Sequence, residues 1–401
     1  MNALLVNPDS FLSTATPAVG GLRLRVFTDM EAVKPIWAGL EATGVSTVYQ
    51  SFVWCRVWLQ RVGKARNISP LIVVAENAFG QTMFILPLQF RSKFGVRIVE
   101  AMTAPQSAYA FGLFAKSFLA DAAHKWFEFH FSDVVDILPQ HDVFKLHDLP
   151  EKIAGFHNPL LAVRNFGAAN QSHIMALQPN YQALLEQKRS AESRRSIRKR
   201  DAKLRAAGTL VFDLPASFEE RKATVETMLA HQKMRLAEAG VHNVFDDVEQ
   251  QFIVDLIHTQ TSEGQFLRPY RLTLDGKIVA VMLGAYRHGI YWALISSLAP
   301  GDIRKYSPGD FALRSMIKNL CEDGTRDLDF SAGDTAYKGH WSDQHIPLYF
   351  IVRANSFVGL FAAAFMVVRE KCKRAAKQTP MLNSLLFDLR RFVSGQNSSA
   401  Q

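Results

Sequence analysis

Two stretches of the chain repeat one pattern of apolar and polar positions. Residues 70–75 and 83–88 are apolar runs on either side of a short glycine-containing turn, and residues 269–274 and 278–285 flank an Asp-Gly turn in the same way. Apolar runs of this length around such a turn predict β-hairpins. Each hairpin follows a segment with helically spaced apolar anchors, so the pattern predicts two similar halves.

Further apolar runs extend each half beyond its hairpin. In the first half they predict a strand at 96–102, a helix near 120–131 and a strand at 143–146. In the second half they predict strands at 289–296, 328–330 and 348–352. Hairpins combined with crossover helices are typical of an α/β or α+β fold. We therefore expect tandem domains that each hold a mixed, mostly antiparallel sheet flanked by helices.

These patterns divide the chain into four segments. They are a flexible N-terminus (1–21), a first domain (22–168), a second domain (169–354) that begins with a basic helix (188–207), and a basic amphipathic helical tail (355–401). With 401 residues and 48% hydrophobic composition, the chain is longer than one typical domain of about 100–200 residues. Length and pattern thus agree on two domains.

Cysteine usage and apolar run lengths predict a cytoplasmic protein. Cys55, Cys321 and Cys372 lie far apart and form no C-x-x-C pair, which argues against a disulfide framework and against a zinc site. Residues 1–20 lack the basic region and unbroken apolar core of a secretory signal. The longest apolar candidate, 357–368, is shorter than the roughly 20 residues of a spanning helix.

The formal net charge of +9 is concentrated in two segments, 188–205 and 369–377. The first carries nine basic residues against two acidic ones, and its apolar positions Ile197 and Leu204 form a thin line. Such a helix buries little and exposes a broad cationic face. This face is either simply solvated, or it recruits an anionic acceptor such as a nucleotide-linked or lipid-linked sugar, or an acyl carrier. Nucleic acid is less favoured because no aromatic residue is interleaved to stack on bases.

A helix that follows the strand at 291–295 begins at a Ser-Pro-Gly turn. Ser307, Pro308 and Gly309 form the turn, and Arg304 and Lys305 precede it. The first turn of a helix offers free backbone N–H groups and the positive end of the helix dipole, which suit a phosphate. Proline is well placed there because its missing N–H has no intrahelical partner. The alternative is that Ser-Pro is only a good helix start.

Several motifs occur together in one order: the basic segment 194–199, the Asp-Gly hairpin, the turn at 306–309, and the polar run from Asp329 to Trp341. In this combination the chain resembles the GNAT-fold acyltransferases of the CelD/BcsL type. These are acetyltransferases linked to cellulose or exopolysaccharide synthesis, similar in architecture to the FemABX aminoacyl transferases. The resemblance covers about 172–353 well, but in the first half it covers only the aromatic helix and the strand at 85–88.

The resemblance implies tandem GNAT-like domains, with an acyl-coenzyme A (acyl-CoA) site in the second. It implies that backbone groups near Leu294 and Ile295 contact the pantetheine arm. The chain departs from the family in one respect, because the pyrophosphate loop Arg/Gln-x-x-Gly-x-Gly/Ala is missing between the strand at 291–295 and the next helix. Phosphate binding would then depend on the Ser307 helix start with Arg304 and Lys305.

Acyl transfer from a thioester needs a base for the acceptor's proton and a donor for the leaving thiolate or the oxyanion. Asp334 is the expected base, Asp329 an orienting or alternative group, and Tyr337 the proton donor. Lys338 would pair with phosphate or substrate, and Trp341 would contact substrate. In this reading acetyl-CoA or another acyl-CoA is the co-substrate and no metal takes part.

An ordinary structural explanation stays open for the same residues. In it Asp334 caps a turn, Tyr337 and Trp341 fill the core, and Lys338 is solvated. His340 is a further candidate base, although a lone histidine beside a tryptophan is more often structural. Motifs of serine hydrolases, P-loop NTPases, dinucleotide oxidoreductases and H-E-x-x-H zinc enzymes are missing from the sequence, which demotes those classes.

The expected function is therefore transfer of an acyl group from acyl-CoA to an amine or hydroxyl, and the resemblance implies a role in polysaccharide or cell-envelope biosynthesis. Substrate contacts are assigned to Lys338, Trp341, Arg195 and Arg198. One rival is a FemABX-like transferase that takes aminoacyl-tRNA, with the basic helix as the RNA contact. The other is a non-catalytic scaffold in polysaccharide assembly. These residues specify neither the acceptor, the acyl-chain length nor the oligomeric state.

The C-terminal tail joins an apolar block, 357–368, to a basic one, and residues 385–392 add a short amphipathic piece. We expect the helix to pack across the second domain. The alternative is contact with an anionic membrane surface, which would make the protein peripheral to the inner membrane.

Overall fold

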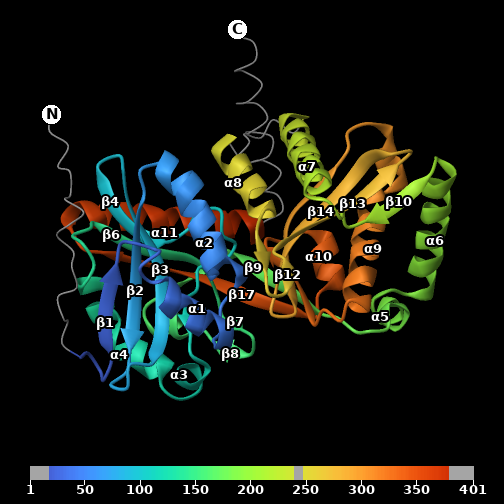
Figure 1. The fold of residues 1–401 in the computed structure, drawn as a ribbon. Helices are drawn as coiled ribbons and strands as arrows, with labels where there is room; N and C mark the ends of the chain where they lie inside the picture. Colours follow the sequence, from blue (N-terminus) through green and yellow to red (C-terminus); the bar gives the residue numbers. More distant parts are fainter. Residues whose placement is uncertain (1–17, 239–246, 379–401) are drawn as a thin grey trace, which may run out of the picture. The chain divides into compact units, whose positions relative to one another are not determined.

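A computed structural model of the 401-residue chain describes residues 18–238 and 247–378 (Figure 1). The described residues form two compact units. The first unit consists of residues up to Asn170 together with Pro347–Arg374, and the second of Gln171–Ile346 with residues from Ala375 onward. Each unit is a mixed sheet flanked by helices, which confirms the predicted α/β class.

The first unit has the strand order β1-β2-β3-β4-β6-β17. These strands are β1 (Arg23–Phe27), β2 (Ser69–Glu76), β3 (Thr82–Lys93), β4 (Val96–Ala101), β6 (Val143–Pro150) and β17 (Gln344–Ala354). The short β5 (Leu113–Phe114) pairs with β3, and β7 (Lys152–Ile153) pairs with β8 (Phe156–His157). All neighbours on this path are antiparallel except β4 and β6, which are parallel. The predicted first hairpin is therefore present as β2–β3.

Helices of the first unit enclose an aromatic core. They are α1 (Lys34–Thr43), α2 (Phe52–Trp58), α3 (Lys116–Asp121), α4 (Ala123–Asp136) and α11 (Phe357–Gln378), with the short η2 (Val48–Gln50), η3 (Leu59–Gly63) and η4 (Pro159–Ala162). The ring of Phe84 on β3 lies 5.0 Å from that of Phe127 and 5.3 Å from that of Trp126, both on α4. Aromatic pairs at such distances add to the stabilisation from apolar burial, so α4 is firmly seated on the sheet.

The second unit has the strand order β9-β16-β15-β14-β13-β10. Its strands are β9 (Phe166–Ala176), β10 (Leu210–Asp213), β13 (Leu267–Leu274), β14 (Lys277–Arg287), β15 (Ile290–Leu298) and β16 (Asp327–Ala332), with a separate pair β11 (Gln260–Thr261) and β12 (Gly264–Gln265). Only β15 and β16 are parallel on this path. The order of antiparallel and parallel pairings is the same as in the first unit, which agrees with the two similar halves that the repeated sequence pattern predicts.

Helices of the second unit are α5 (Tyr181–Lys188), α6 (Ala191–Ala206), α7 (Phe218–Glu238), α8 (Asp247–Ile257), η5 (Asp302–Tyr306), α9 (Pro308–Glu322) and α10 (Ala336–Trp341). Apolar side chains of α9, among them Leu313 and Ile317, pack on Tyr270 and Tyr291 of the sheet. Figure 1 shows α9 between this sheet and α6. The crossover helix α9 thus links the sheet to the basic helix.

The last strand of each sheet comes from a distant part of the chain. β17 follows the second unit in sequence, yet it pairs with β6 from Leu348↔Pro150 to Ala354↔Val143. β9 follows the first unit's β6 in sequence, yet it pairs with β16. For this reason the units differ from the predicted boundaries, since 347–374 belongs with the first unit and not with 169–346.

The predicted helical tail is present as α11, and its expected packing on the second domain is wrong for residues 357–374. The backbone at Gly359 approaches the carbonyl of Asp142, and Glu370 accepts a hydrogen bond from the Ala169 N–H of the first unit. The amphipathic piece 385–392 and most of the N-terminal segment 1–21 lie outside the described residues. Among the described helices, none has the combination of length and apolar character that crossing a bilayer requires.

Substitution of Gly284 by Ala should destabilise the second unit. A Cβ atom at this position would overlap the ring of Tyr291, whose buried hydroxyl donates to the carbonyls of Arg268 and Met282. Such overpacking costs about 1–3 kcal/mol. Urea denaturation of Gly284→Ala should show this loss of unfolding free energy. The control is Gly39→Ala on α1, where nothing lies within 4 Å of the added Cβ, and it should leave stability unchanged or slightly raised. Equal effects of the two changes would contradict the close approach.

Candidate active site

β15 and β16 separate in the middle of the second unit. They pair in parallel at Ile290↔Asp327, Tyr291↔Leu328 and Trp292↔Asp329, and β15 then continues to Leu298 without a β16 partner among the described residues. β16 bends away because Ser331 has a left-handed backbone with φ 61°. Its hydroxyl donates a 2.7 Å hydrogen bond to the carbonyl of Ala293 on β15. The kink at Ser331 thus sets where the two strands part.

The first turn of α9 lies against the end of β15. Ser307 has a left-handed backbone with φ 57°, and its side chain makes no capping hydrogen bond. It is therefore not an ordinary N-cap, whose side-chain oxygen would accept from the first turn. Gly309 lies so close to β15 that an added Cβ would be 2.8 Å from Leu298 Cδ2. The helix start is positioned by this close approach to β15, on which the half-buried Leu294 and Ile295 also lie.

Charged side chains around this helix start are unequally available to a ligand. The guanidinium of Arg304 is committed to the carbonyl of Ala299 and, at 3.0 Å, to Glu238. Lys305 is exposed, with its ammonium 5.2 Å from the centre of the Tyr306 ring. Asp310, in the first turn, pairs with Arg314 at 3.2 Å. Lys305 is thus better placed than Arg304 to meet an incoming anion.

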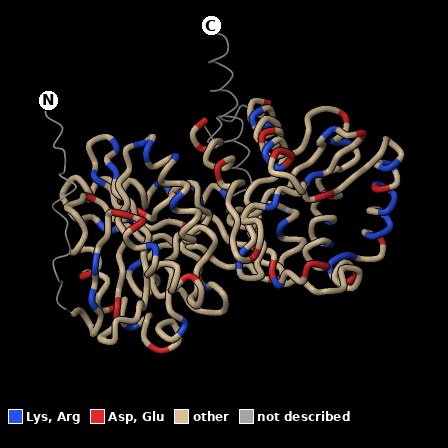
Figure 2. The backbone as a smooth tube through the Cα atoms, viewed as in Figure 1, with Lys and Arg blue, Asp and Glu red and all other residues tan. Residues whose placement is uncertain are grey.

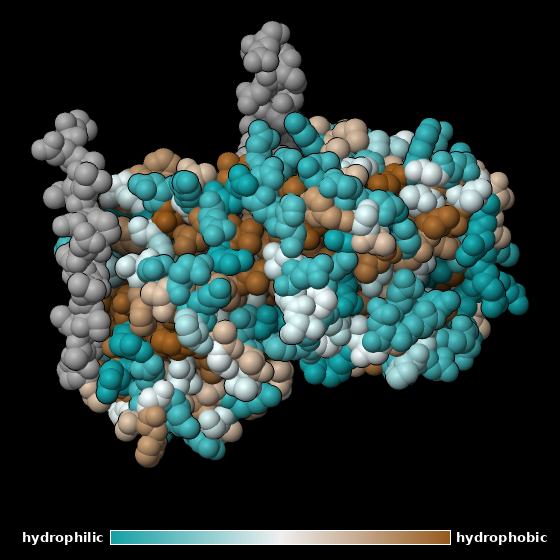
Figure 3. Space-filling model, in the orientation of Figure 1, coloured by the Kyte–Doolittle hydropathy of each residue, from teal (hydrophilic) through white to brown (hydrophobic). Residues whose placement is uncertain are grey.

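The basic helix α6 packs on α9, and the two residues of its predicted thin apolar line are buried. Ile197 and Leu204 are buried, and Leu204 packs with Phe311 of α9. The 2.9 Å bond from Arg314 to Asp201 joins the two helices. Figure 2 shows Lys and Arg along α6, and the surface over it is largely hydrophilic in Figure 3.

Arg195 and Arg198 are both exposed on α6. They lie on the same helix that Leu204 and Asp201 anchor to α9. The cationic face is therefore carried by a well-packed element, and not by a loosely attached one.

Asp334, just beyond the kink, is joined to two histidines. Its Oδ1 is 3.1 Å from Nε2 of His173 on β9, and Nδ1 of His173 is 3.1 Å from Nδ1 of His345 on β17. An ionised carboxylate only accepts hydrogen bonds, so Nε2 of His173 donates to Asp334. In neutral His173, Nδ1 then accepts from His345, which leaves Nε2 of His345 as a lone-pair base on an exposed side chain.

Burial lowers the pKa of His173, and this effect outweighs the hydrogen bond to Asp334, which acts in the opposite direction. His173 is therefore neutral at neutral pH, as the hydrogen-bond directions require. Asp334 itself is 40% exposed and also lies 3.5 Å from the ammonium of Lys377. The three residues form a polar connection from a buried position to the surface.

The buried side chains of Lys338 and Asp329 stabilise the kink of β16 at Ser331 through hydrogen bonds to its backbone. The ammonium of Lys338 donates to the carbonyl of Ala332 at 3.0 Å, and the carboxylate of Asp329 accepts from the N–H of Ser331 at 2.6 Å. Burial lowers the pKa of Lys338, while Asp329 and Asp334 oppose that shift. Both side chains are buried, so the solvated position considered for Lys338 is wrong.

Tyr337 and Trp341 take different positions on α10. Tyr337 is 42% exposed and its ring meets that of Phe330 edge to face. Burial raises the pKa of Tyr337, so the hydroxyl stays protonated and able to donate. Trp341 is fully buried in the core, with the guanidinium of Arg189 4.3 Å from its ring centre. Of the two, Trp341 fills the core and Tyr337 is accessible to a ligand.

The predicted residues thus form two groups in the second unit. Asp329, Asp334, Tyr337 and Lys338 gather around the end of β16, and residues 304–309 lie at the end of β15. His173 and His345 were not predicted. They are 172 positions apart in the chain, and no local motif marks either of them.

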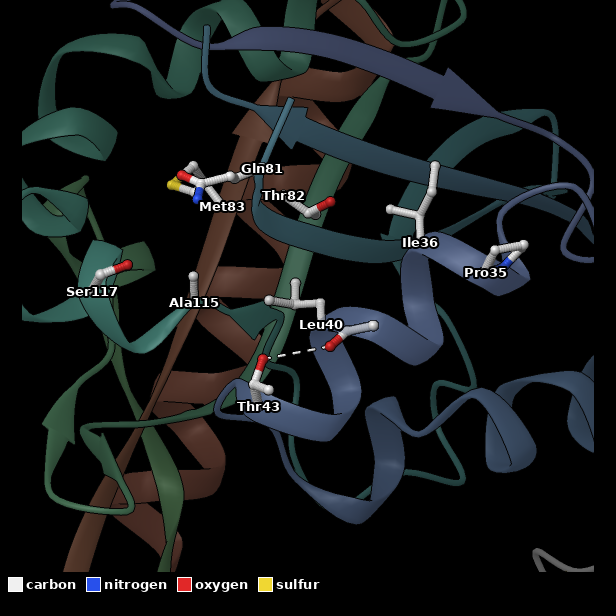
Figure 4. A pocket seen from close by; sticks show the side chains of 10 residues that line it. Pro35, Ile36, Leu40, Thr43, Gln81, Thr82, Met83, Ala115 and Ser117 are labelled. Atoms are coloured by element: carbon white, nitrogen blue, oxygen red, sulfur yellow. Dashed lines mark hydrogen bonds between the residues drawn. The ribbon is translucent and has the colours of Figure 1, made fainter. Parts of the chain in front are cut away.

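One pocket in the first unit contains none of the predicted residues. It encloses about 370 Å³ between α1, the start of β3 and the residues around Ala115 (Figure 4). Leu40, Thr43, Thr82 and Ser117 are part of its wall. The wall contains no titratable side chain, so this pocket is not a candidate for proton transfer.

An NMR titration of the imidazole resonances should place the pKa of His173 below the ordinary value of about 6.5. Asp334→Asn removes a partner that raises this pKa, so the value should fall further, whereas His345→Gln should raise it. Because the folded pKa is lowered, the contribution of His173 to stability is complete above pH about 6.5 and is lost as pH falls below it. An unchanged pKa in both variants would show that the three side chains are not joined in solution.

Comparisons with known proteins concern mainly this unit. Residues 191–339, from the first residue of α6 into α10, match the family model described as acetyltransferase (GNAT) domain. No curated protein matches the chain. Among solved structures, FemX is similar with a TM-score of 0.56 at 11% identity, covering 79% of this chain and 94% of FemX.

Two further structures are less similar. The C-terminal domain of a putative lysylphosphatidylglycerol synthetase from Agrobacterium fabrum has a TM-score of 0.48 at 11% identity, covering 84% of this chain and 97% of that one. A tandem GNAT protein from the clavulanic acid biosynthesis pathway has a TM-score of 0.42 at 11% identity, covering 84% and 99%. At such identities the likeness to FemX shows the fold alone. The segment from α6 into α10, which contains the kink of β16 and the start of α9, is thus similar in sequence to a GNAT acetyltransferase domain.

Proposed function

We propose that the second unit transfers an acetyl or other acyl group from acyl-CoA to an amine or hydroxyl acceptor. The observation that carries the proposal is the separation of β15 from β16 beside the first turn of α9, within the residues that match the GNAT domain. Strand edges that part expose backbone groups to a ligand, and a helix start attracts phosphate. One thioester co-substrate would use both features.

The cofactor contacts follow from these positions. The backbone N–H of Gly309 and the hydroxyl of Ser307, together with Lys305, would meet the pyrophosphate. Pro308 has no N–H to offer, and the N–H of Ser307 already donates to the carbonyl of Arg304. Arg304 would act mainly by holding the loop, because its guanidinium already binds Ala299 and Glu238. Leu294 and Ile295 would lie along the pantetheine arm.

The acceptor would attack the thioester carbonyl directly. As it attacks, its proton would pass to Asp334 directly, or to Nε2 of His345. In the second route Nδ1 of His345 would give its proton to Nδ1 of His173, and Nε2 of His173 would give its own to Asp334. The C–S bond then breaks, and the hydroxyl of Tyr337 would donate a proton to the leaving thiolate. A covalent acyl-cysteine is disfavoured because Cys321, the cysteine of this unit, is buried and burial raises its pKa.

Asp329 and Lys338 would act by keeping the kink in shape, since both bind backbone groups there. Trp341, buried beneath them, would support α10 without touching substrate. Arg195 and Arg198 would attract an anionic acceptor, and the resemblance to the CelD/BcsL type favours a nucleotide-linked or lipid-linked sugar in polysaccharide or cell-envelope biosynthesis.

A second candidate uses aminoacyl-tRNA as the donor. The observation that favours it is the exposed cationic face of α6, on a fold similar to that of FemX. Phosphate neutralisation by such a face would make binding of transfer RNA fall steeply with salt. A cytoplasmic location is compatible with either donor.

Isothermal titration should show that acetyl-CoA binds the full chain and that Lys305→Glu weakens binding about tenfold or more, because a charge-assisted contact becomes a repulsive one. Lys277→Glu, the same change at an exposed lysine that begins β14, should bind like the wild type. Free coenzyme A and a longer acyl-CoA, titrated alongside, distinguish recognition of the phosphates from recognition of the acyl chain. If no thioester binds while transfer RNA does, with steep salt dependence, the second candidate replaces the first.

Asp334→Asn and Tyr337→Phe should each lower turnover about 10²- to 10⁴-fold with little change in acyl-CoA affinity, because they remove proton transfer and not binding. Release of the coenzyme A thiol, followed with a panel of amine and hydroxyl acceptors, measures the loss. Asp323→Asn, at the C-terminal end of α9, is the matched control and should keep full turnover. Full turnover in all three variants would rule out this assignment of roles, and binding without turnover on any acceptor would favour a scaffold.

A further inference from the structure

Helix α11 carries its large apolar side chains on the outside. Six of them are exposed: Phe357, Val358, Leu360, Phe361, Phe365 and Val368. The side that meets the first unit is instead built from small residues and one acid, namely Gly359, Ala363 and Glu370, which are all buried. An amphipathic helix that belonged only to the core would have the opposite arrangement.

The exposed apolar residues form one stripe. Phe357, Phe361, Phe365 and Val368 follow one another at spacings of four, four and three, so they share one side of the helix. The buried residues lie roughly opposite, because Glu370 is about 180° from Phe361 at 3.6 residues per turn. The apolar stripe is therefore directed away from the unit that holds the helix.

Cationic side chains lie along both margins of the stripe. Arg369 and Lys371 are exposed and project about 80° to either side of Phe361. The one acidic residue of α11, Glu370, is buried and binds the N–H of Ala169 and the ring of His147. No exposed carboxylate on α11 therefore offsets these cations.

We propose that this face of α11 docks on an anionic lipid bilayer, with the helix lying in the interface. An apolar stripe enters the boundary between headgroups and acyl chains, while flanking Lys and Arg contact lipid phosphates. The residues of the stripe belong to the first unit, whereas the proposed acyl-CoA contacts belong to the second.

The apolar stripe could be covered by a lipid bilayer, by a second copy of this chain or by residues 379–401, and the charge of each favours an anionic bilayer. A second copy of this chain carries a net charge of +9 and would be repelled at long range. Residues 379–401 hold one acidic side chain, Asp388, against the two basic ones of Arg390 and Arg391, so their side chains offer no net negative charge to the margins. An anionic bilayer satisfies both the stripe and its margins.

Co-sedimentation of the full chain with vesicles tests the proposal. Vesicles of phosphatidylcholine and phosphatidylglycerol in equal parts should bind the wild type, and phosphatidylcholine alone should bind it much less. The double variant Phe361→Ser with Phe365→Ser should weaken binding about tenfold or more. Arg369→Gln with Lys371→Gln should weaken it about tenfold and reduce its salt dependence. The control is Phe129→Ser on α4, since Phe129 and Phe361 are both 63% exposed, and it should bind like the wild type.

Three results would overturn the proposal. The first is equal sedimentation of the wild type, the double phenylalanine variant and the control. The second is a stable dimer in sedimentation velocity that the Phe361 and Phe365 changes dissociate, with no vesicle binding, which would assign the stripe to a second copy. The third is binding only by a chain that ends at Gln378, which would show that residues 379–401 occupy the stripe.

Discussion

Parallel pairing between β15 and β16 ends after Trp292 and Asp329. The positions of the candidate site residues in the second unit depend on where this pairing ends. A left-handed backbone at Ser331 is unfavourable for a residue with a side chain, so the surroundings must hold it in place. They do so through Asp329 on its N–H, Ala293 on its hydroxyl and Lys338 on the adjacent carbonyl. The predicted site residues thus include two, Asp329 and Lys338, that stabilise the backbone beside Asp334 and Tyr337.

Burial separates the roles of these polar side chains. Asp334 and Tyr337 remain partly exposed at the end of β16, whereas Asp329 and Lys338 are enclosed. Burial keeps His173 neutral, and a neutral ring can accept a hydrogen bond from one partner while donating to another. This single protonation state lets buried His173 join Asp334 to His345 through hydrogen bonds.

Both units have the same order of strand pairings, but the polar side chains beside the parallel pair differ between them. The first unit has the same parallel step between β4 and β6, but there Glu100 of β4 is buried and paired with Arg91 and Lys145. A carboxylate held by two cations is stabilised in its charged form and is a poor proton acceptor. The same parallel step therefore borders a candidate site in the second unit and a buried group of ion pairs in the first.

Local pattern by itself determined the elements of this protein. Short-range periodicity and turn chemistry, which each segment carries within itself, predict both hairpins, the basic helix with its line of Ile197 and Leu204, and the helix start at Pro308.

Tertiary structure decided which segments contact one another. His173 contacts Asp334 and His345 only because β9, which carries His173, comes from a part of the chain distant from β16 and β17. The outward stripe of α11 depends on Gly359, because the absence of a side chain there lets the helix approach Asp142 with its small residues inward. The periodicity of a sequence predicts that a helix has an apolar side. Which side of the helix is buried depends on the shape of the surface on which it packs.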